Sequence, residues 1–284
     1  MATGITKVSD LNSLYNAIFE DAIFVARESN IMTGLVSTFT GKGMMTRTFT
    51  TRPQISATVK AEGEDFVTPI KFGKASVGTL TPATVFAQSL LTDEDLDTDP
   101  ENAKAQCATE LGNAISTKID RDMCADFASL ATDKGPGASG TATIAKFATA
   151  IAVLRNALCP NPIQIVLHPY CWFDIWSELG QPAATKALLG DLASQALKDF
   201  YVGDWLLANW YVSANIVPSG TDAVSCIFNP QSLAFDSRQP PESEPERDAS
   251  RKATELNISA IYAHGLGRRP TWGVKYTSDV TEPS

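Results

Sequence analysis

The sequence predicts an α+β fold, because segments with strand and helix periodicity follow one another along its 284 residues. In the segment 44–81, apolar and polar side chains alternate with the period of two that is typical of strands, which predicts a long polar hairpin. Apolar side chains then recur at helical spacing over Asp99–Leu130. The segment 143–179 predicts a helix, a short apolar strand and a second helix, which together would form a compact α/β subdomain.

The charge balance argues against a protein that binds nucleic acid through a general basic surface. The chain carries 23 Lys and Arg against 32 Asp and Glu, a net charge of −9, whereas phosphate neutralisation needs many clustered cations. Only 19% of the residues are charged, against about 25% in an ordinary soluble domain. We therefore expect part of the surface to be hidden in an assembly.

The amino terminus carries no apolar segment typical of a signal peptide, and no stretch approaches the roughly 18 apolar residues of a membrane span. A soluble, untargeted protein is expected. The five cysteines show no CxxC spacing, which favours reduced thiols in a cytosolic setting.

The amino-terminal segment Val8–Arg27 predicts an amphipathic helix with Ser9 or Asp10 as its N-cap. Its apolar side chains recur at helical spacing: Leu11, Leu14, Tyr15, Ile18, Phe19, Ala22, Ile23 and Ala26. A Gly- and Thr-rich stretch, 30–43, follows as a loose tether. The segment is interpreted as an arm, and packing on its own domain is the alternative.

The first arm of the hairpin and the tether before it form the most basic part of the chain. No acidic residue lies between Glu28 and Glu62, and the interval holds a charge of +4 from Lys42, Arg47, Arg52 and Lys60. A strand is expected where Ile55, Ala57 and Val59 alternate with polar residues, then a turn at 62–65 and a second extended run at 66–81. Because such arms bury too little apolar area to be stable alone, the hairpin should lie on its own domain or across a neighbouring subunit.

An acidic stretch, 93–101, leads into the long helix. Asp99 is a favourable N-cap, Pro100 suits the first helical position, and Glu101 suits the positive end of the helix dipole. A calcium loop is the weaker account, because the Gly and Glu that an EF-hand requires are missing. The helical stripe comprises Cys107, Leu111, Ile115, Ile119, Met123 and Phe127. We expect roughly 30 helical residues, about 45 Å at 1.5 Å per residue.

The carboxyl-terminal half predicts further strands at 163–167 and 223–228. The letters of 135–140 match GxGxxG, but a helix precedes them, so a flexible linker or helix stop is favoured over nucleotide binding. The Pro- and Glu-rich segment 239–251 is interpreted as an exposed loop. Strands at Leu256–His264 and Thr271–Tyr276 are expected to rejoin the sheet next to the long helix.

No catalytic, cofactor or metal site is expected. The sequence contains no GxSxG nucleophile elbow for which His168 or His264 could act as the general base, and it contains no HExxH, P-loop or paired-cysteine motif. His168 is interpreted as structural. Cys107 and Cys124, on the helical stripe, are expected to be buried small hydrophobes.

The order of these segments resembles the major capsid proteins of tailed bacteriophages, the fold type named after phage Hong Kong 97. The stretches Ile163–Trp176 and His264–Tyr276 look most like members of that family. The resemblance implies five segments: an N-terminal arm (1–43), an extended hairpin or E-loop (44–81), a peripheral domain with the spine helix (82–140), an axial domain (141–235), and an acidic loop with returning peripheral strands (236–284).

The resemblance implies a subunit that is not an enzyme and that self-assembles through pentamers and hexamers into an icosahedral shell. The shell would enclose phage double-stranded DNA without sequence-specific binding. Its other partners would be a separate scaffolding protein, because no scaffolding domain precedes the arm, together with a portal and decoration proteins. The location implied is the virion capsid, after synthesis in the host cytoplasm, with no membrane partner.

The residues expected at contacts between subunits lie in the hairpin: Arg47, Arg52, Lys60, Glu62, Glu64, Asp65, Lys71 and Lys74. The basic stretch 42–60 is expected to meet acidic surface such as 93–101, since charge complementarity sets register between partners. Some family members cross-link a hairpin lysine to an asparagine of a neighbour. Lys60, Lys71 and Lys74 are available for this, but no matching asparagine or catalytic glutamate is identified.

Two alternatives remain open at this point. A cellular nanocompartment shell of the encapsulin type has the same fold and would package an enzyme cargo instead of DNA. A small-molecule-binding protein or enzyme would use the Trp-rich region between Trp172 and Trp210 as its pocket.

Overall fold

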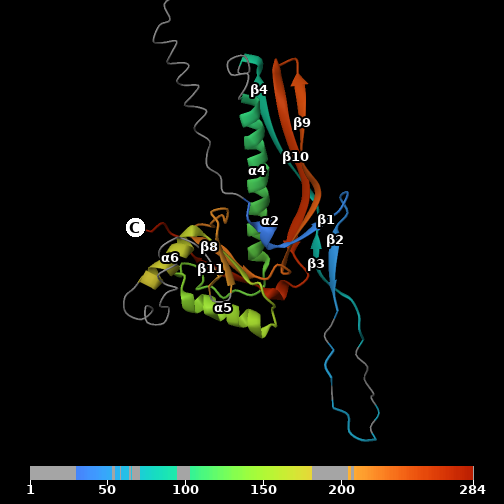
Figure 1. Cartoon of the computed structure of the whole chain (residues 1–284), viewed down its shortest axis with the longest axis vertical. Helices are drawn as coiled ribbons and strands as arrows, with labels where there is room; N and C mark the ends of the chain where they lie inside the picture. Colours follow the sequence, from blue (N-terminus) through green and yellow to red (C-terminus); the bar gives the residue numbers. More distant parts are fainter. Residues whose placement is uncertain are drawn as a thin grey trace, which may run out of the picture. The chain divides into compact units, whose positions relative to one another are not determined.

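A computed structural model describes residues 30–52, 55–57, 59–63, 65, 71–94, 103–180, 204–205 and 208–283 (Figure 1). The described chain forms two compact units. The first contains Phe86–Thr117 and Pro241–Ser259, and the second contains Asn30–Val85, Lys118–Pro240 and Ala260–Ser284. The predicted helix at Val8–Arg27 and the N-cap Asp99 lie outside the described residues.

The long helix, α4 (Ala103–Ala125), has 23 residues and is followed by a 3-10 turn, η1 (Asp126–Ser129). At 1.5 Å per residue α4 spans about 34 Å, so the described helix is shorter than expected at its carboxyl end. Four residues of the predicted stripe are buried: Leu111, Ile115, Met123 and Phe127. Cys124 is buried as expected, whereas Cys107 is partly exposed.

A four-stranded sheet has the order β1-β9-β10-β4, with β1 at Ser37–Thr40, β9 at Leu233–Asp248, β10 at Ala253–Leu266 and β4 at Ala83–Thr92. The strand predicted at Leu256–His264 is therefore confirmed within β10. The loose tether predicted at 30–43 is wrong in part, because it contains a short helix, α2 (Met32–Leu35), and β1. Backbone pairing of β1 with β9, from Ser37↔Ala234 to Thr40↔Ser237, holds this stretch in place.

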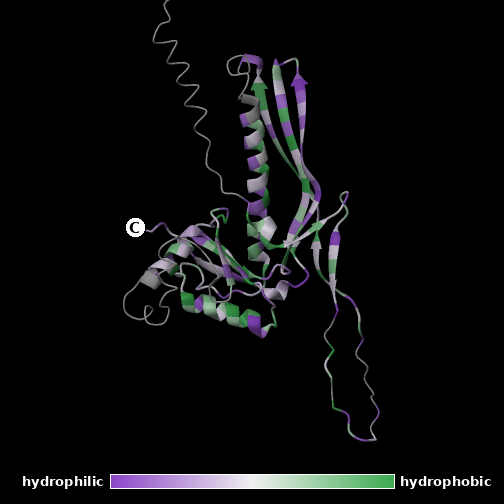
Figure 2. Cartoon of the chain, in the orientation of Figure 1, coloured by the Kyte–Doolittle hydropathy of each residue, from purple (hydrophilic) through white to green (hydrophobic). Residues whose placement is uncertain are grey.

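The exposed loop predicted at 239–251 is wrong, because most of it belongs to the 16-residue strand β9. Its residues from Pro240 to Arg247 are exposed, as the composition indicated, and Figure 2 shows this half of the strand as mostly hydrophilic. Since β1 pairs only as far as Ser237, the outer edge of β9 beyond it has no partner strand among the described residues. Prolines are tolerated on such an edge because their missing N–H removes no essential sheet hydrogen bond.

The second unit contains a five-stranded sheet of order β11-β8-β5-β7-β6. Its strands are β5 (Gln164–Leu167), β6 (Asp204–Trp205), β7 (Ala208–Val212), β8 (Asp222–Phe228) and β11 (Gly273–Asp279). The helices α5 (Ile144–Asn156) and α6 (Pro169–Gly180) confirm the two predicted there. The final strand departs from expectation: β11 pairs with β8 over seven residues and so joins this sheet, not the one that contains β4.

The core of this second sheet is aromatic. Phe147 of α5 stacks on Tyr276 of β11 with ring centroids 3.9 Å apart, and Trp210 of β7 lies 5.1 Å from Phe147. All three side chains are at most 2% exposed. Burial of a large aromatic side chain contributes about 1.5–3 kcal/mol, so this cluster is a principal source of stability for the unit.

The GxGxxG segment is a fixed loop, which corrects the expected flexible linker. Lys134 and Gly137 donate backbone hydrogen bonds to Lys275 and Thr277 of β11, both at 3.1 Å. A Cβ added at Gly135 would lie 2.2 Å from the carbonyl oxygen of Thr277. The glycine is therefore required by close backbone packing, and no nucleotide-binding strand precedes the loop.

Across the described part of the chain, no helix is both long enough and apolar enough to cross a membrane.

Candidate assembly surfaces

The hairpin is paired only at its base, where β2 (Arg47–Thr51) lies antiparallel to β3 (Ala75–Leu80). The hairpin itself is confirmed, but the strand predicted around Ile55–Val59 is wrong, since the described residues of both arms beyond Thr51↔Ala75 form no strand. Alternation alone gave the wrong position because a strand needs a partner for its backbone groups. The predicted turn is confirmed at Glu62–Gly63, where Gly63 has φ +83°.

A small hydrophobic cluster fixes this base within the second unit. Phe49 of β2 and Leu80 of β3 are buried against Ala234 of β9 and Ala263 of β10, with Phe39 of β1 packed beside them. The rings of Phe39 and Phe49 lie 5.3 Å apart. The root of the hairpin is therefore part of the subunit core.

A buried charge cluster reinforces the same root. Asp236 of β9 is fully buried and accepts hydrogen bonds from Arg47 Nε at 2.8 Å and from Arg238 at 2.6 Å. Arg47 also donates to the carbonyl oxygen of Thr40 and lies 5.1 Å from the ring centre of Phe39. Removing one partner of such a pair leaves a buried charge without a counter-ion, which lowers the free energy of unfolding by about 3–5 kcal/mol. Arg47, predicted as an inter-subunit residue, thus has its described partners within its own chain.

The arms beyond the base present both charge and apolar surface. The guanidinium of Arg52 lies 4.8 Å from the ring centre of Phe72 and joins the two arms. Three apolar side chains are exposed there: Ile55 at 55%, Val59 at 102% and Phe72 at 52%. The predicted contact residues Lys60, Glu62, Asp65, Lys71 and Lys74 are exposed, and Glu64 lies outside the described residues.

The predicted acidic partner surface is only partly described, and one of its carboxylates is already paired within the chain. Arg247 of β9 binds Asp93 through both terminal nitrogens, one of them at 2.7 Å. The Arg247 hydrogen bond holds the pKa of Asp93 below its ordinary value. Sequence reasoning missed a second acidic feature, the exposed carboxylates of Glu242, Glu244 and Glu246 on β9. Their spacing of two, typical of one face of a strand, was the available signal.

In the part that the structure describes, the Trp-rich region is packed. Trp172 of α6 and Trp210 of β7 are 6% and 2% exposed, with ring centroids 6.0 Å apart. These two side chains pack into the interior of the second unit, so there is no open space between them for the pocket that the small-molecule alternative requires. A shallow hollow exists elsewhere, between the end of α4 and the β7–β8 connection.

The two histidines have structural partners. His168 is buried, its Nδ1 accepts the backbone N–H of Tyr170 at 3.3 Å, and burial lowers its pKa. His264 Nδ1 lies 2.8 Å from Asp126 Oδ2, and this hydrogen bond raises the pKa of the imidazole. Within the described ranges, no three His, Cys, Asp or Glu side chains are gathered where a metal ion could bind.

Comparison with solved structures identifies the fold. A chain of Mycobacterium phage Che8 is 18% identical, with a TM-score of 0.68 over 90% of this chain and 94% of that one. A mature capsid chain of bacteriophage PhiM1 is 12% identical, with a TM-score of 0.68 over 92% and 90%. The acid-stable capsid of Helicobacter pylori bacteriophage KHP30 gives 10% identity and a TM-score of 0.68 over 91% and 93%. A search of curated proteins gives no match.

The spine-like helix, the two sheets and the hairpin rooted in the core thus define a shell-forming protein with the Hong Kong 97-type capsid fold, as the order of segments predicted. The chain belongs to the phage capsid protein family, whose sequence model matches residues 89–276. It is a structural subunit of an icosahedral shell, which is the function expected of a tailed-phage major capsid protein. The family assignment favours this function over the nanocompartment and small-molecule alternatives.

Proposed function

We propose that the hairpin is the principal contact through which subunits form pentamers and hexamers. The observation that carries this proposal is the contrast along the hairpin: its root is buried in the core, whereas Ile55, Val59 and Phe72 expose apolar surface. A two-stranded ribbon is not stable alone in water, so these side chains require another surface. A neighbouring subunit supplies that surface in the shell.

The charged residues of the arms set the register of this contact. Lys60, Lys71 and Lys74 face solvent, and acidic surface on the neighbour, within 93–101 and along β9, would complement them. Many such contacts repeat around five- and six-fold rings, and their small energies add up to a stable shell. The segments 1–43, 82–140 and 141–235 act as arm, peripheral and axial parts of the subunit.

The assembled shell encloses double-stranded phage DNA, has no catalytic role, and forms in the host cytoplasm around a separate scaffolding protein. A portal occupies one vertex, and decoration proteins bind the outer surface. The net charge of −9 supports this arrangement, because an acidic subunit does not cling to the DNA that it contains.

The test replaces residues 52–74 with Asn-Gly. Thr51 and Ala75 are paired, so a two-residue type I′ turn joins them without strain. We expect a folded subunit with unchanged circular dichroism and no shells in negative-stain images of the protein expressed with its scaffolding partner. Normal shells from this variant would refute the proposal.

A single substitution, Val59→Asp, gives a finer test. Val59 is fully exposed in the single chain, so its burial in an interface contributes about 1.5 kcal/mol per contact, equivalent to about tenfold in association. Shell yield should fall while the unfolding midpoint of the free subunit stays the same. Leu158→Asp, at a position 76% exposed and outside the hairpin, is the matched control and should assemble normally.

A further inference from the structure

Two cysteines of the second unit lie on surfaces that face each other. Cys124 is next to the last residue of α4, and Cys226 is in the middle of β8. Both are buried and both are thiols. Neither has a role in the assembly contacts described above.

Alternation along β8 places Cys226 on the face of the strand that meets α4 and η1. Val224, Cys226 and Phe228 share one face because side chains alternate along a strand, and β8 pairs with β11 over its whole length without a break in register. Val224 lines the hollow at the end of α4, and the ring of Phe228 lies 6.1 Å from that of Phe127 in η1. Cys226 lies between these two contacts on the same face.

The opposite face of β8 carries a different cysteine contact. Ser225 accepts the backbone N–H of His168 at 3.4 Å and is hydrogen-bonded to the Cys171 thiol of α6. Cys171 therefore lies on the other side of the sheet from Cys226, which leaves Cys124 as the cysteine that Cys226 faces.

The helix presents Cys124 to the same face of β8. Cys124 is three residues before Phe127, and residues at this spacing lie on one side of a helix. Cys124 also lines the hollow together with Val224. Burial, and after it the neighbouring Cys124, raises the pKa of the Cys226 thiol. The contacts on either side of Cys226 and the interaction between the two thiols thus agree in bringing this pair together.

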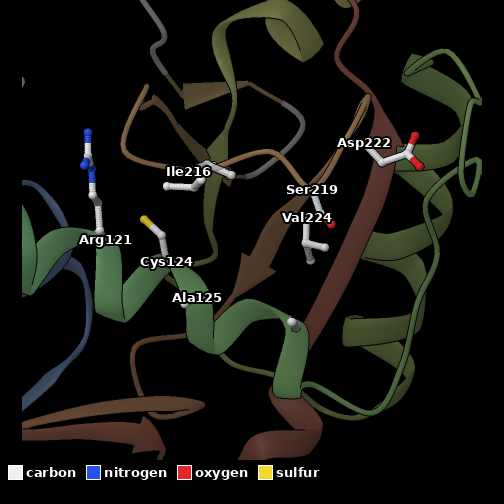
Figure 3. A pocket seen from close by; sticks show the side chains of 9 residues that line it. Arg121, Cys124, Ala125, Ile216, Ser219, Asp222 and Val224 are labelled. Carbon is white, nitrogen blue, oxygen red and sulfur yellow. The ribbon is translucent and has the colours of Figure 1, made fainter.

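The hollow gives a small reagent access to one thiol of the pair. It has a volume of about 250 Å³, and Figure 3 shows the sulfur of Cys124 pointing into it. Val217 and Ala125 on its walls are exposed, so the hollow opens to solvent. Cys226 is 0% exposed and does not line the hollow. A reagent in solution therefore meets Cys124 first.

We propose that Cys124 and Cys226 form an intrachain disulfide by exchange with a low-molecular-weight disulfide, and that this bond joins the end of α4 to the five-stranded sheet. The Cys124 thiolate attacks one sulfur of the reagent and releases the other as a thiol, which leaves a mixed disulfide in the hollow. The Cys226 thiolate then attacks the Cys124 sulfur and releases the second reagent thiol. Together the two cysteines lose two protons and two electrons, and the reagent is reduced to two thiols.

The state of this pair follows the redox compartment. The thiols persist where small thiols are abundant, and the disulfide forms where small disulfides prevail. A cross-link that closes a loop of about 100 residues strongly restricts the unfolded chain. The subunit therefore gains resistance to unfolding when it passes from a reducing to an oxidising compartment. Because only a thiolate attacks, burial makes the exchange slow at neutral pH and faster at higher pH.

The test treats the full-length, unassembled subunit with bis(2-hydroxyethyl) disulfide under native conditions, so its outcome does not depend on shell formation. Remaining thiols are blocked with N-ethylmaleimide, and unreduced peptides are identified by mass spectrometry. We expect a linked pair of peptides that contain Cys124 and Cys226, on a chain that runs as a monomer, and loss of the link on treatment with dithiothreitol. The urea midpoint of the oxidised subunit should exceed that of the reduced one.

Two variants serve as controls. Cys226→Ala should stop the reaction at the mixed disulfide on Cys124. Cys171→Ala removes another fully buried cysteine, from the other side of the sheet, and should leave the 124–226 link unchanged.

The peptide map of the unsubstituted chain decides the matter, whether or not a variant folds. A mixed disulfide on Cys124 that never passes to Cys226 would overturn the proposal, because it would show that the two sulfurs do not meet. Reaction confined to the partly exposed Cys107, or a 124–226 link that forms only in urea, would overturn it as well.

Discussion

Replacing Asp120 by alanine should destabilise the second unit by about 4 kcal/mol. The substitution removes the acceptor of three hydrogen bonds, from the backbone N–H groups of Ile31 and Met32 and from the Asn215 amide. Each unsatisfied buried donor costs about 1–3 kcal/mol. The Met32 and Asn215 bonds are buried and count fully, whereas the Ile31 bond is partly exposed, so water replaces some of its loss.

The assay is urea unfolding of the free subunit followed by tryptophan fluorescence, since Trp172 and Trp210 are buried in the same unit. Asp120→Asn keeps one carbonyl oxygen and should cost about half as much as alanine. Lys118→Ala, which removes an exposed ion pair with Asp122, should cost less than about 1 kcal/mol. A loss below about 1 kcal/mol for Asp120→Ala would refute the view that this carboxylate joins three segments.

Two further substitutions test other parts of the structure. The hydrogen bond to Asp126 raises the pKa of His264 in the folded protein above its ordinary value of about 6.5. The stabilisation by this pair is therefore present below that pH and is lost as the pH rises through the folded pKa. His264→Gln should therefore lower the urea midpoint at about pH 5.5 but much less at about pH 9; an equal effect at both would contradict the ion pair. Gly135→Ala places a methyl group against the Thr277 backbone and should lower the free energy of unfolding by about 2 kcal/mol or more. Gly137→Ala has open space around the new methyl group but a φ of +92°, and it should lower the free energy of unfolding by less. Thermal melts of the two variants decide which is the less stable.

Elements with strong local patterns could be predicted from the sequence. The predicted bounds lie within a few residues of the observed ones for α5, α6, β5 and β8. These predictions succeeded because the apolar side chains of these elements pack into one nearby core. The order of such elements was also enough to indicate the capsid fold. Local pattern failed for β9, where Pro and Glu favour a loop but pairing with β10 holds an exposed strand.

The candidate surface was predictable only in its exposed part. Lys60, Lys71 and Lys74 face solvent, as charged residues of a thin hairpin must. The partner of Arg47 could not be foreseen, because Asp236 lies 189 residues away and neither residue stands in a recognisable motif. The sheet joined by β11 was missed for the same reason, since its pairing with β8 is long-range.

The outer edge of β9, which has no partner strand among the described residues beyond Ser237, affects how readily free subunits aggregate before assembly. A shell is built from many copies of one subunit, and a long unpaired strand on each free copy would ordinarily pair with strands of other molecules and form aggregates. Pro241 and Pro245 lie an even number of residues after Ser237, whose carbonyl faces β1, so they remove backbone donors from this edge. The glutamates between and after them repel a second copy of the same edge. The Pro- and Glu-rich composition, which makes this strand resemble a loop in the sequence, therefore limits edge-to-edge aggregation of free subunits before they assemble.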